Sequence, residues 1–283
     1  MLRLVDSHTH IDQILRKLER PLEDYAAFKQ DALLQETVLQ ETDADADGGV
    51  VEHRLQLERC LTISCALESV QATRGFIEAD ADVFGAFGMH PCNAKDYGDQ
   101  VEKDLLELMD HPKVVAWGEM GLDYVYLTST KEQQREAFAR QLKAAASKRM
   151  PIVIHTRDAE EDTLELLKEH TPKDSKIHIH CFTSSWNMAE QLLEHFENVF
   201  FGFTGVVTFN SAKAVREVVS KMPLNRILLE TDGPYMAPVP FRGKACHSGM
   251  LPYTLQKIAQ VKGVPLRTAH ETIRENTRRM YGI

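Results

Sequence analysis

Residues 114–156 contain an apolar run, VVAWGEMGLD (114–123), then a helical pattern, QREAFARQLKAAASKRM (134–150), and directly after it a second apolar run, PIVIHT (151–156). Two strand-like runs separated by a helix are typical of a β-α-β unit, in which the two strands pair in parallel. This stretch therefore predicts a fold of the α/β class.

Six more strand-like runs extend the same alternation along the chain. They are RLVDSH (3–8), CLTISC (60–65), VFGAFGMH (83–90), KIHIHCF (176–182), VFFGFTG (199–205) and RILLETD (226–232). Eight strands that mostly alternate with helices favour a single-domain (β/α)8 TIM barrel over residues 1–283, and barrels of about 250 residues form one domain. A doubly wound open sheet is the alternative. The last helix is expected to begin at RTAHE, with Thr268 and Glu271 as a capping box, and to end at Gly282.

Composition limits the functions that this chain can have. Hydrophobic residues make up 43% and charged residues 27%, an ordinary globular balance. No apolar run approaches the roughly 20 residues that cross a bilayer. The five cysteines are odd in number and unevenly spaced, so we expect reduced thiols in a cytoplasmic or nuclear protein. A formal net charge of −9 argues against a broad basic surface for nucleic acid, but it permits a phosphate substrate held by metal ions and a few arginines.

Seven polar residues fall at the carboxyl ends of six predicted strands. They are His8, His10, His90, Glu119, His155, His180 and Asp232. His8 and His10 point to the same face of a strand, because side chains alternate along it. Any one of these residues could be a buried structural group. Active sites of (β/α)8 barrels lie at this end of the strands, however, and all seven are nitrogen or oxygen metal ligands. Together they predict a metal site.

The motifs in these strands resemble those of the TatD deoxyribonucleases, metal-dependent (β/α)8 hydrolases of the amidohydrolase superfamily. The matching segments are DSHTHID, AFGMHP, GEMGLDY, PIVIHTRDA, IHCFTSS, GFTGVVTF, LLETDGPYMAPVPFRGK and ENTRRMYG, in this order. The resemblance implies that divalent cations are held by His8, His10, Glu119, His155, His180 and Asp232, and that the substrate is the phosphodiester backbone of DNA.

Two divalent cations (Mg²⁺, Mn²⁺ or Zn²⁺) agree with this mixed set of ligands. We expect Glu119 to bridge the two ions. His8 and His10 would then hold one ion with Asp232, while His155 and His180 hold the other. Asp232 and Glu119 are the expected catalytic residues, and Asp232 is placed to accept a proton from the attacking water. Glu230 is expected to orient a ligand.

Four further residues are predicted to contact the substrate. Arg157 and Arg242 suit phosphate, because the planar guanidinium binds it through two donors, although a surface ion pair is the alternative for each. His90 would donate to phosphate, and Tyr124 would form a stacking or hydrogen-bonding wall.

The chain departs from the TatD pattern in two places. An acidic insertion around residues 30–54 includes LLQETVLQETDADADGGVVEHR, whose first half looks helical and whose remainder is expected to be a solvated acidic loop. Asp43, Asp45, Asp47 and Gly48 imitate a calcium-binding loop, but Arg54 stands where that loop requires glutamate. The second departure is KACHSGML, where Cys246 and His247 would reshape the edge of the cleft.

These observations favour a metal-dependent exonuclease that trims DNA ends or single strands, acting as a monomer with no membrane partner. One alternative is another amidohydrolase reaction on a phosphotriester, lactone or amide, but Glu119 occupies the place of the carboxylated lysine that many of those enzymes use. Another alternative is a barrel that binds metal without catalysis. It would lack one of the ligands, and no ligand is missing.

Overall fold

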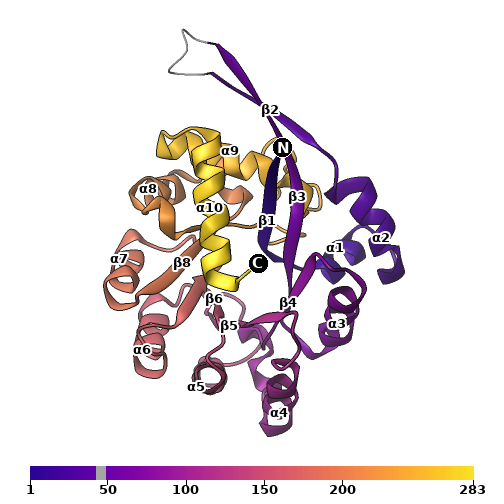
Figure 1. The fold of residues 1–283 in the computed structure, drawn as a ribbon. Coiled ribbons are helices and arrows are strands. Elements are labelled where there is room, and N and C mark those ends of the chain that lie inside the picture. The colour runs from indigo at the N-terminus through magenta and orange to yellow at the C-terminus, as the bar shows by residue number, and fades with distance from the viewer. Residues whose placement is uncertain (43–48) are drawn as a thin grey trace. The chain divides into compact units, whose positions relative to one another are not determined.

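The computed structural model describes residues 1–42 and 49–283, which form nine β-strands and ten α-helices (Figure 1). The strands are β1 (Leu2–Thr9), β2 (Thr37–Thr42), β3 (Val50–Ser64), β4 (Val83–Phe87), β5 (Val114–Asp123), β6 (Ile152–Arg157), β7 (Lys176–Ile179), β8 (Asn198–Phe203) and β9 (Ile227–Leu229). The helices are α1 (Ile11–Lys17), α2 (Tyr25–Phe28), α3 (Val70–Ala79), α4 (Asp99–Leu108), α5 (Lys131–Lys148), α6 (Glu160–His170), α7 (Trp186–His195), α8 (Lys213–Lys221), α9 (Leu251–Lys262) and α10 (Leu266–Tyr281).

The strand order is that of a (β/α)8 barrel. It runs β1-β3-β4-β5-β6-β7-β8-β9, and the consecutive pairs from β4 to β8 are parallel. The first and last strands of this order are neighbours: Asp232 N donates to His8 O at 2.9 Å, and His10 N donates to Gly233 O at 3.0 Å. An open sheet would leave these two strands apart. The predicted barrel and its eight strands are therefore confirmed, and the doubly wound alternative is wrong.

Two compact units make up the chain, and we describe each by itself. The first unit comprises Met1–Cys60 and Phe203–Thr277, and the second comprises Leu61–Gly202 and Arg278–Ile283. The first unit contains β1, β2 and β9, and the second contains β4 to β7.

In the second unit, helix α5 fixes the ends of two strands through buried glutamines. Gln141 accepts from Met89 N at 2.8 Å and from Trp117 Nε1 at 3.2 Å. Gln134 accepts from Asp123 N at 2.8 Å and donates to the Asp123 carbonyl at 2.9 Å. Buried polar groups are costly unless they are hydrogen-bonded, so these hydrogen bonds fix the position of α5 on β5.

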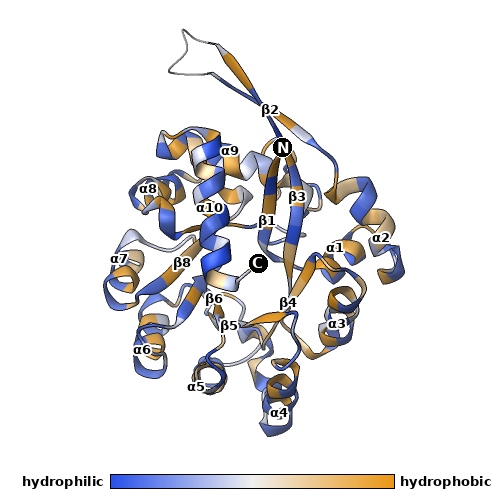
Figure 2. Cartoon of the chain, viewed as in Figure 1, coloured by the Kyte–Doolittle hydropathy of each residue, from blue (hydrophilic) through white to orange (hydrophobic). Residues whose placement is uncertain are grey.

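Figure 2 shows that the helices α3 to α6 carry both hydrophobic and hydrophilic residues, whereas β4 and β5 are mainly hydrophobic.

The acidic insertion forms a hairpin in the part that the structure describes. Strand β2 pairs antiparallel with β3, in register from Thr37↔Leu55 to Thr42↔Val50. The expected helix is therefore wrong at residues 37–42, and the expected loop is wrong at residues 50–54. Leu39 is buried between exposed neighbours, and this alternation has the period of a strand rather than of a helix. Residues 43–48, on which the calcium motif depends, lie outside the described residues.

Helix α10 begins at Leu266, two residues before the predicted capping box, so the box at Thr268 is wrong. The hairpin supplies the missing acceptor, since the Glu41 carboxylate oxygens lie 2.9 and 3.2 Å from Leu266 N. A residue distant in sequence thus satisfies the helix terminus, and a search for a local cap cannot find it.

None of the five cysteines, all of which lie within the described residues, forms a disulfide bond. None of the helices in residues 1–42 and 49–283 combines the length and the apolar character that crossing a bilayer requires.

Candidate metal centre

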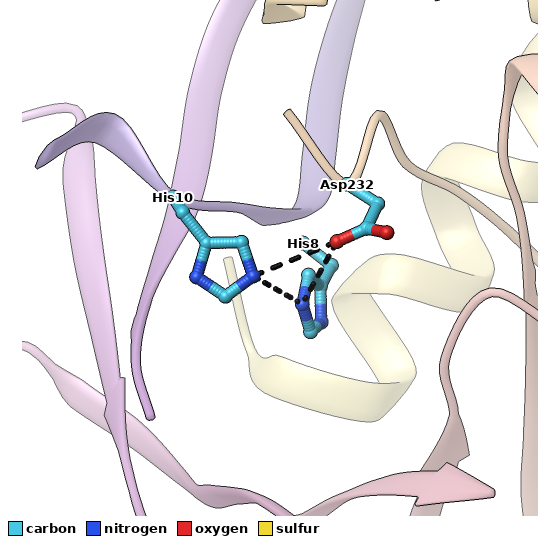
Figure 3. Close-up of side chains that lie close together, drawn as sticks. All are labelled: His8, His10 and Asp232. Carbon is cyan, nitrogen blue, oxygen red and sulfur yellow. Dashed lines mark hydrogen bonds and ion pairs between the residues drawn. The ribbon is translucent and has the colours of Figure 1, made fainter. Parts of the chain in front are cut away.

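In the first unit, three side chains converge on one point (Figure 3). His8 Nε2 and His10 Nε2 are 3.3 Å apart, and the Asp232 Oδ1 atom lies 3.8 Å from the first and 3.5 Å from the second. All three residues are buried. His8 and His10 come from β1 and the residue that follows it, and Asp232 follows β9.

These distances suit a shared cation. Two atoms that each bind a zinc ion at about 2.0–2.1 Å with tetrahedral angles are separated by about 3.3 Å. The two imidazole nitrogens have that separation. Lone pairs this close repel unless a proton or a cation lies between them. The donors of the cluster, two imidazoles and one carboxylate, therefore fit a divalent metal.

A buried carboxylate one layer deeper holds the two strands in register. Asp6 Oδ1 accepts from Thr231 N at 3.0 Å, and its Oδ2 accepts from Thr231 Oγ1 at 2.6 Å. Burial raises the pKa of Asp6 to about 7, although these hydrogen bonds oppose the shift. Asp6 thus fixes the backbone that carries His8 and Asp232.

In the second unit, three histidines surround one carboxylate oxygen. Glu119 Oε1 lies 2.8 Å from His180 Nε2, 2.9 Å from His155 Nδ1 and 3.6 Å from His90 Nε2. His155 Nδ1 and His180 Nε2 are themselves 3.1 Å apart. These four residues come from β4 to β7 or from the residues directly after them. His90, Glu119 and His155 form a second set of atoms close enough to hold one metal ion.

Electrostatics in this cluster favour a cation. Burial alone would raise the pKa of Glu119, but His180 and His90 outweigh it and hold that pKa well below the usual value. Burial alone would lower the pKa of His155, but hydrogen bonds to Asp123 and Glu119 raise it to about 9. Burial and neighbouring His155 lower the pKa of His90 to about 3. The ionised Glu119 therefore lies among three histidines that are not all protonated together. A bound divalent ion would supply the positive charge that this carboxylate needs.

Asp123 is a residue that the sequence reasoning missed. Its Oδ2 lies 3.2 Å from His155 Nε2, on the opposite side of the ring from Glu119. Histidines that bind metal commonly donate their other ring N–H to a carboxylate, which fixes the tautomer. The sequence did offer a signal for Asp123, because this residue is the last one of the apolar run that ends in GEMGLD. We placed Glu119 at the end of this strand, but β5 continues to Asp123, so that Glu119 lies inside the strand.

The structure thus brings the predicted ligands together in two groups, one in each unit. His8, His10 and Asp232 form the first, while Glu119, His155 and His180 form the second together with His90, which we had expected only as a substrate contact. The bridging role of Glu119 stays a prediction. Glu230 is fully buried, and its role as an orienting residue also stays a prediction.

The other predicted substrate residues have aromatic or acidic neighbours. Arg157 lies over the ring of Tyr126 at 4.8 Å, and Arg242 lies over the ring of Phe209 at 3.6 Å. The Tyr124 hydroxyl hydrogen-bonds to Asp162. Their contacts with a substrate stay predictions.

Imidazoles and carboxylates gathered at the strands of a (β/α)8 barrel are typical of the class of metal-dependent hydrolases. Within this class, the family model described as TatD related DNase matches residues 5–282. The chain belongs to this family, as the motifs predicted.

Several known proteins are similar in sequence to most of this chain. It is 46% identical over 205 residues to the human 3'-5' RNA nuclease TATDN2, an alignment that covers 71% of this chain and 27% of that protein. The chain thus spans about a quarter of the length of this human relative. The uncharacterized metal-dependent hydrolase YcfH of Escherichia coli is 33% identical over 280 residues, which cover 99% of this chain and 96% of YcfH.

Solved structures show the same fold. The TatD homologue YjjV of Escherichia coli matches with a TM-score of 0.80 and 22% identity, over 99% of this chain and 98% of that one. A TatD family hydrolase of Entamoeba histolytica also matches with a TM-score of 0.80, at 20% identity and over 99% and 98% of the two chains.

Proposed function

We propose that this protein is a two-metal nuclease that hydrolyses phosphodiester bonds at the ends of single-stranded nucleic acid, with DNA as the expected substrate. The observation that carries the proposal is the pair of clusters, each with three nitrogen or oxygen atoms placed to bind one cation. Two sets of ligands in a family of metal-dependent hydrolases support two ions, one held by each cluster.

The cations would be Mg²⁺, Mn²⁺ or Zn²⁺, and they would neutralise the charge of the phosphate and make water more acidic. The residues of the chain supply the remaining functions. His8 and His10, both close to Asp232, would hold one cation together with it. We also assign to Asp232 the role of accepting a proton from the attacking water. Glu119 remains ionised among its histidines and therefore keeps the charge that a ligand needs.

Two arginines are assigned to the phosphates of the strand. Arg157 and Arg242 are both exposed, and the guanidinium group of each lies over an aromatic ring. A ring positions a guanidinium group without using its N–H donors, which stay available for phosphate. The name of the human relative makes RNA the main competing substrate.

The test is a chelation and reconstitution assay. Purified protein is stripped of metal and then given Mg²⁺, Mn²⁺ or Zn²⁺ singly. It is offered end-labelled single-stranded DNA, double-stranded DNA and single-stranded RNA, together with chromogenic phosphotriester, lactone and amide substrates. We expect shortening of single-stranded DNA from one end, and none in chelator. Faster RNA cleavage would change the substrate to RNA, and turnover of the chromogenic substrates alone would refute a nuclease.

A further inference from the structure

The loop after β5 exposes three consecutive apolar side chains. Val125, Tyr126 and Leu127 are 44%, 57% and 54% exposed, respectively. An exposed aromatic ring between two exposed aliphatic residues costs solvation free energy, so such groups often mark a binding surface.

Hydrogen bonds hold this loop in one conformation. The Asp123 Oδ1 atom accepts from Val125 N and from Tyr126 N, each at 2.8 Å. The Cys92 carbonyl accepts from Thr128 Oγ1 at 2.6 Å and from Ser129 Oγ at 3.0 Å. Tyr126 is therefore presented by an ordered backbone, so a ligand would lose little entropy in ordering it.

The same contacts connect the loop to the second cluster. Asp123 holds Tyr126 N with one oxygen and faces His155 Nε2 with the other. Cys92 donates its backbone N–H to His90 Nδ1 at 3.1 Å, so His90 is tied to the segment that anchors the loop. Cys92 Sγ also donates to the Tyr126 carbonyl at 3.5 Å. Tyr126 is thus two hydrogen bonds away from His155, through Asp123, and from His90, through Cys92.

Arg157 completes the surface. It pairs with Asp123 in the register between β5 and β6, and its guanidinium lies 4.8 Å from the centre of the Tyr126 ring. Arg157 forms no ion pair with any residue that the structure describes. An exposed arginine without a carboxylate partner, in a chain of net charge −9, is suited to an anionic ligand.

We propose that Tyr126 is a stacking platform for an unpaired nucleobase and that Arg157 binds the phosphate next to that base. The inference rests on the proposed function, since the strand must reach the metal centre for a base to meet Tyr126. Exposed aromatic rings beside arginines bind single strands with little sequence preference, because every base has a π-face. A duplex would present no such face except at its ends.

The experiment measures binding of single-stranded DNA and RNA oligonucleotides in a Glu119→Gln background, which prevents cleavage. Tyr126→Ala is compared with Tyr126→Phe, which keeps the ring, and with Tyr126→Leu, which keeps apolar bulk without a ring. Leu127→Ala is the matched control, because Leu127 is equally exposed on the same loop. Circular dichroism verifies the fold of each variant.

We expect Tyr126→Ala and Tyr126→Leu to weaken binding by about 5-fold or more, within the range of base–aromatic stacking. Tyr126→Phe and Leu127→Ala should stay within about 2-fold. A single abasic site, moved through the terminal positions, should abolish the effect of Tyr126→Ala at one position. The fluorescence of 2-aminopurine at that position should fall when the oligonucleotide binds the protein with native Tyr126, and it should not fall with the Tyr126→Ala variant.

Three results would overturn the inference. Equal binding by Tyr126→Ala and the protein with native Tyr126 would show that the ring does not contact the strand. An equal loss with every abasic oligonucleotide would show that no single base is stacked. If either result is found and the unsubstituted protein cleaves single strands, the proposed function stands and only the stacking platform is refuted. If the unsubstituted protein neither binds nor cleaves single strands, the proposed function and the stacking platform are both refuted.

Discussion

Asp123 Oδ2 lies 3.2 Å from His155 Nε2, at the end of β5 beside β6. Burial would raise the pKa of Asp123, but hydrogen bonds from His155 and from the backbone of Tyr126 and Val125 lower it to about 2. A carboxylate that stays ionised keeps a proton of His155 on Nε2. Nδ1, on the Glu119 side of the ring, is then the nitrogen that would bind a metal ion in place of its own proton.

Asp123→Asn should therefore weaken metal binding. The amide can present its oxygen either to the loop N–H groups or to His155, but not to both, so one of the two contacts is lost. We expect metal affinity to fall about 10- to 100-fold, the usual effect of removing such a partner. Calorimetric titration with each metal at constant pH measures this. The control is Asp162→Asn, whose carboxylate contacts Tyr124 instead. Equal affinities in all three proteins would contradict the role.

Glu119→Gln should abolish nearly all hydrolysis while the fold persists. The amide has the shape of the carboxylate but not the charge that lies within 2.9 Å of two imidazoles. Metal content per chain, measured by emission spectrometry after dialysis, should fall with the activity. The exposed Glu136→Gln is the matched control. Full metal occupancy with full turnover would show that Glu119 is not a ligand.

Periodicity alone was sufficient to predict the barrel. Runs such as PIVIHT and KIHIHCF alternate with helices, and all eight became strands of the predicted order. The grouping of the candidate ligands was predictable for a related reason, since parallel strands bring their carboxyl ends to one edge. His155 and His180 needed only their places at strand ends to be brought together.

Contacts between distant segments could not be predicted in this way. Strand β2 depends on pairing with β3, so its sequence, which reads as helical by itself, is decided by its partner. The cap of α10 comes from Glu41, 225 residues before Leu266. Asp123 was overlooked because its role depends on a histidine in the next strand.

The contact between Glu41 and Leu266 leads to a prediction about stability. Glu41 also lies 3.1 Å from His53 Nε2, so one carboxylate joins both strands of the hairpin to α10. Glu41→Ala should lower the free energy of unfolding by about 1 kcal/mol, the usual cost of losing a helix cap. Urea denaturation measures the change. Glu52→Ala is the control, since it removes only an exposed ion pair with Arg54. Equal effects of the two substitutions would show that the cap contributes no more than a surface charge.

The salt dependence of binding tests how an acidic protein holds a polyanion. Lys244 is exposed two residues after Arg242, and we include it as a third cation. If Arg157, Arg242 and Lys244 each contact one phosphate, the slope of log affinity against log salt should be roughly −2 for single strands. Arg242→Ala should reduce the steepness by about 0.7, one phosphate's share, for every base sequence tested. Titration in the Glu119→Gln background measures it, with Arg74→Ala as control because Arg74 pairs with Glu78. A steep slope that Arg242→Ala leaves unchanged would place the strand elsewhere.

His247 should make the protein sensitive to acid. Its ring packs edge-on against Phe28, with centroids 5.8 Å apart, and its Nδ1 atom is buried with no hydrogen-bond partner among the described residues. Burial lowers the pKa of His247 to about 4, below the ordinary value of 6.5.

Between these two values the unfolded chain binds a proton at His247 and the folded chain does not. The free energy of unfolding should therefore fall as pH decreases from about 6.5 towards 4, by up to about 1.4 kcal/mol per pH unit from this group. Above pH 6.5 the imidazole is neutral in both states, and the contribution is constant. His247→Phe keeps a ring against Phe28 and removes the titration. In urea denaturation between pH 7.5 and 5, with chelator throughout, the stability of His247→Phe relative to the native sequence should increase as pH falls, because all other groups are common to both. A difference that stays constant with pH would show that His247 is protonated equally in the folded and unfolded states.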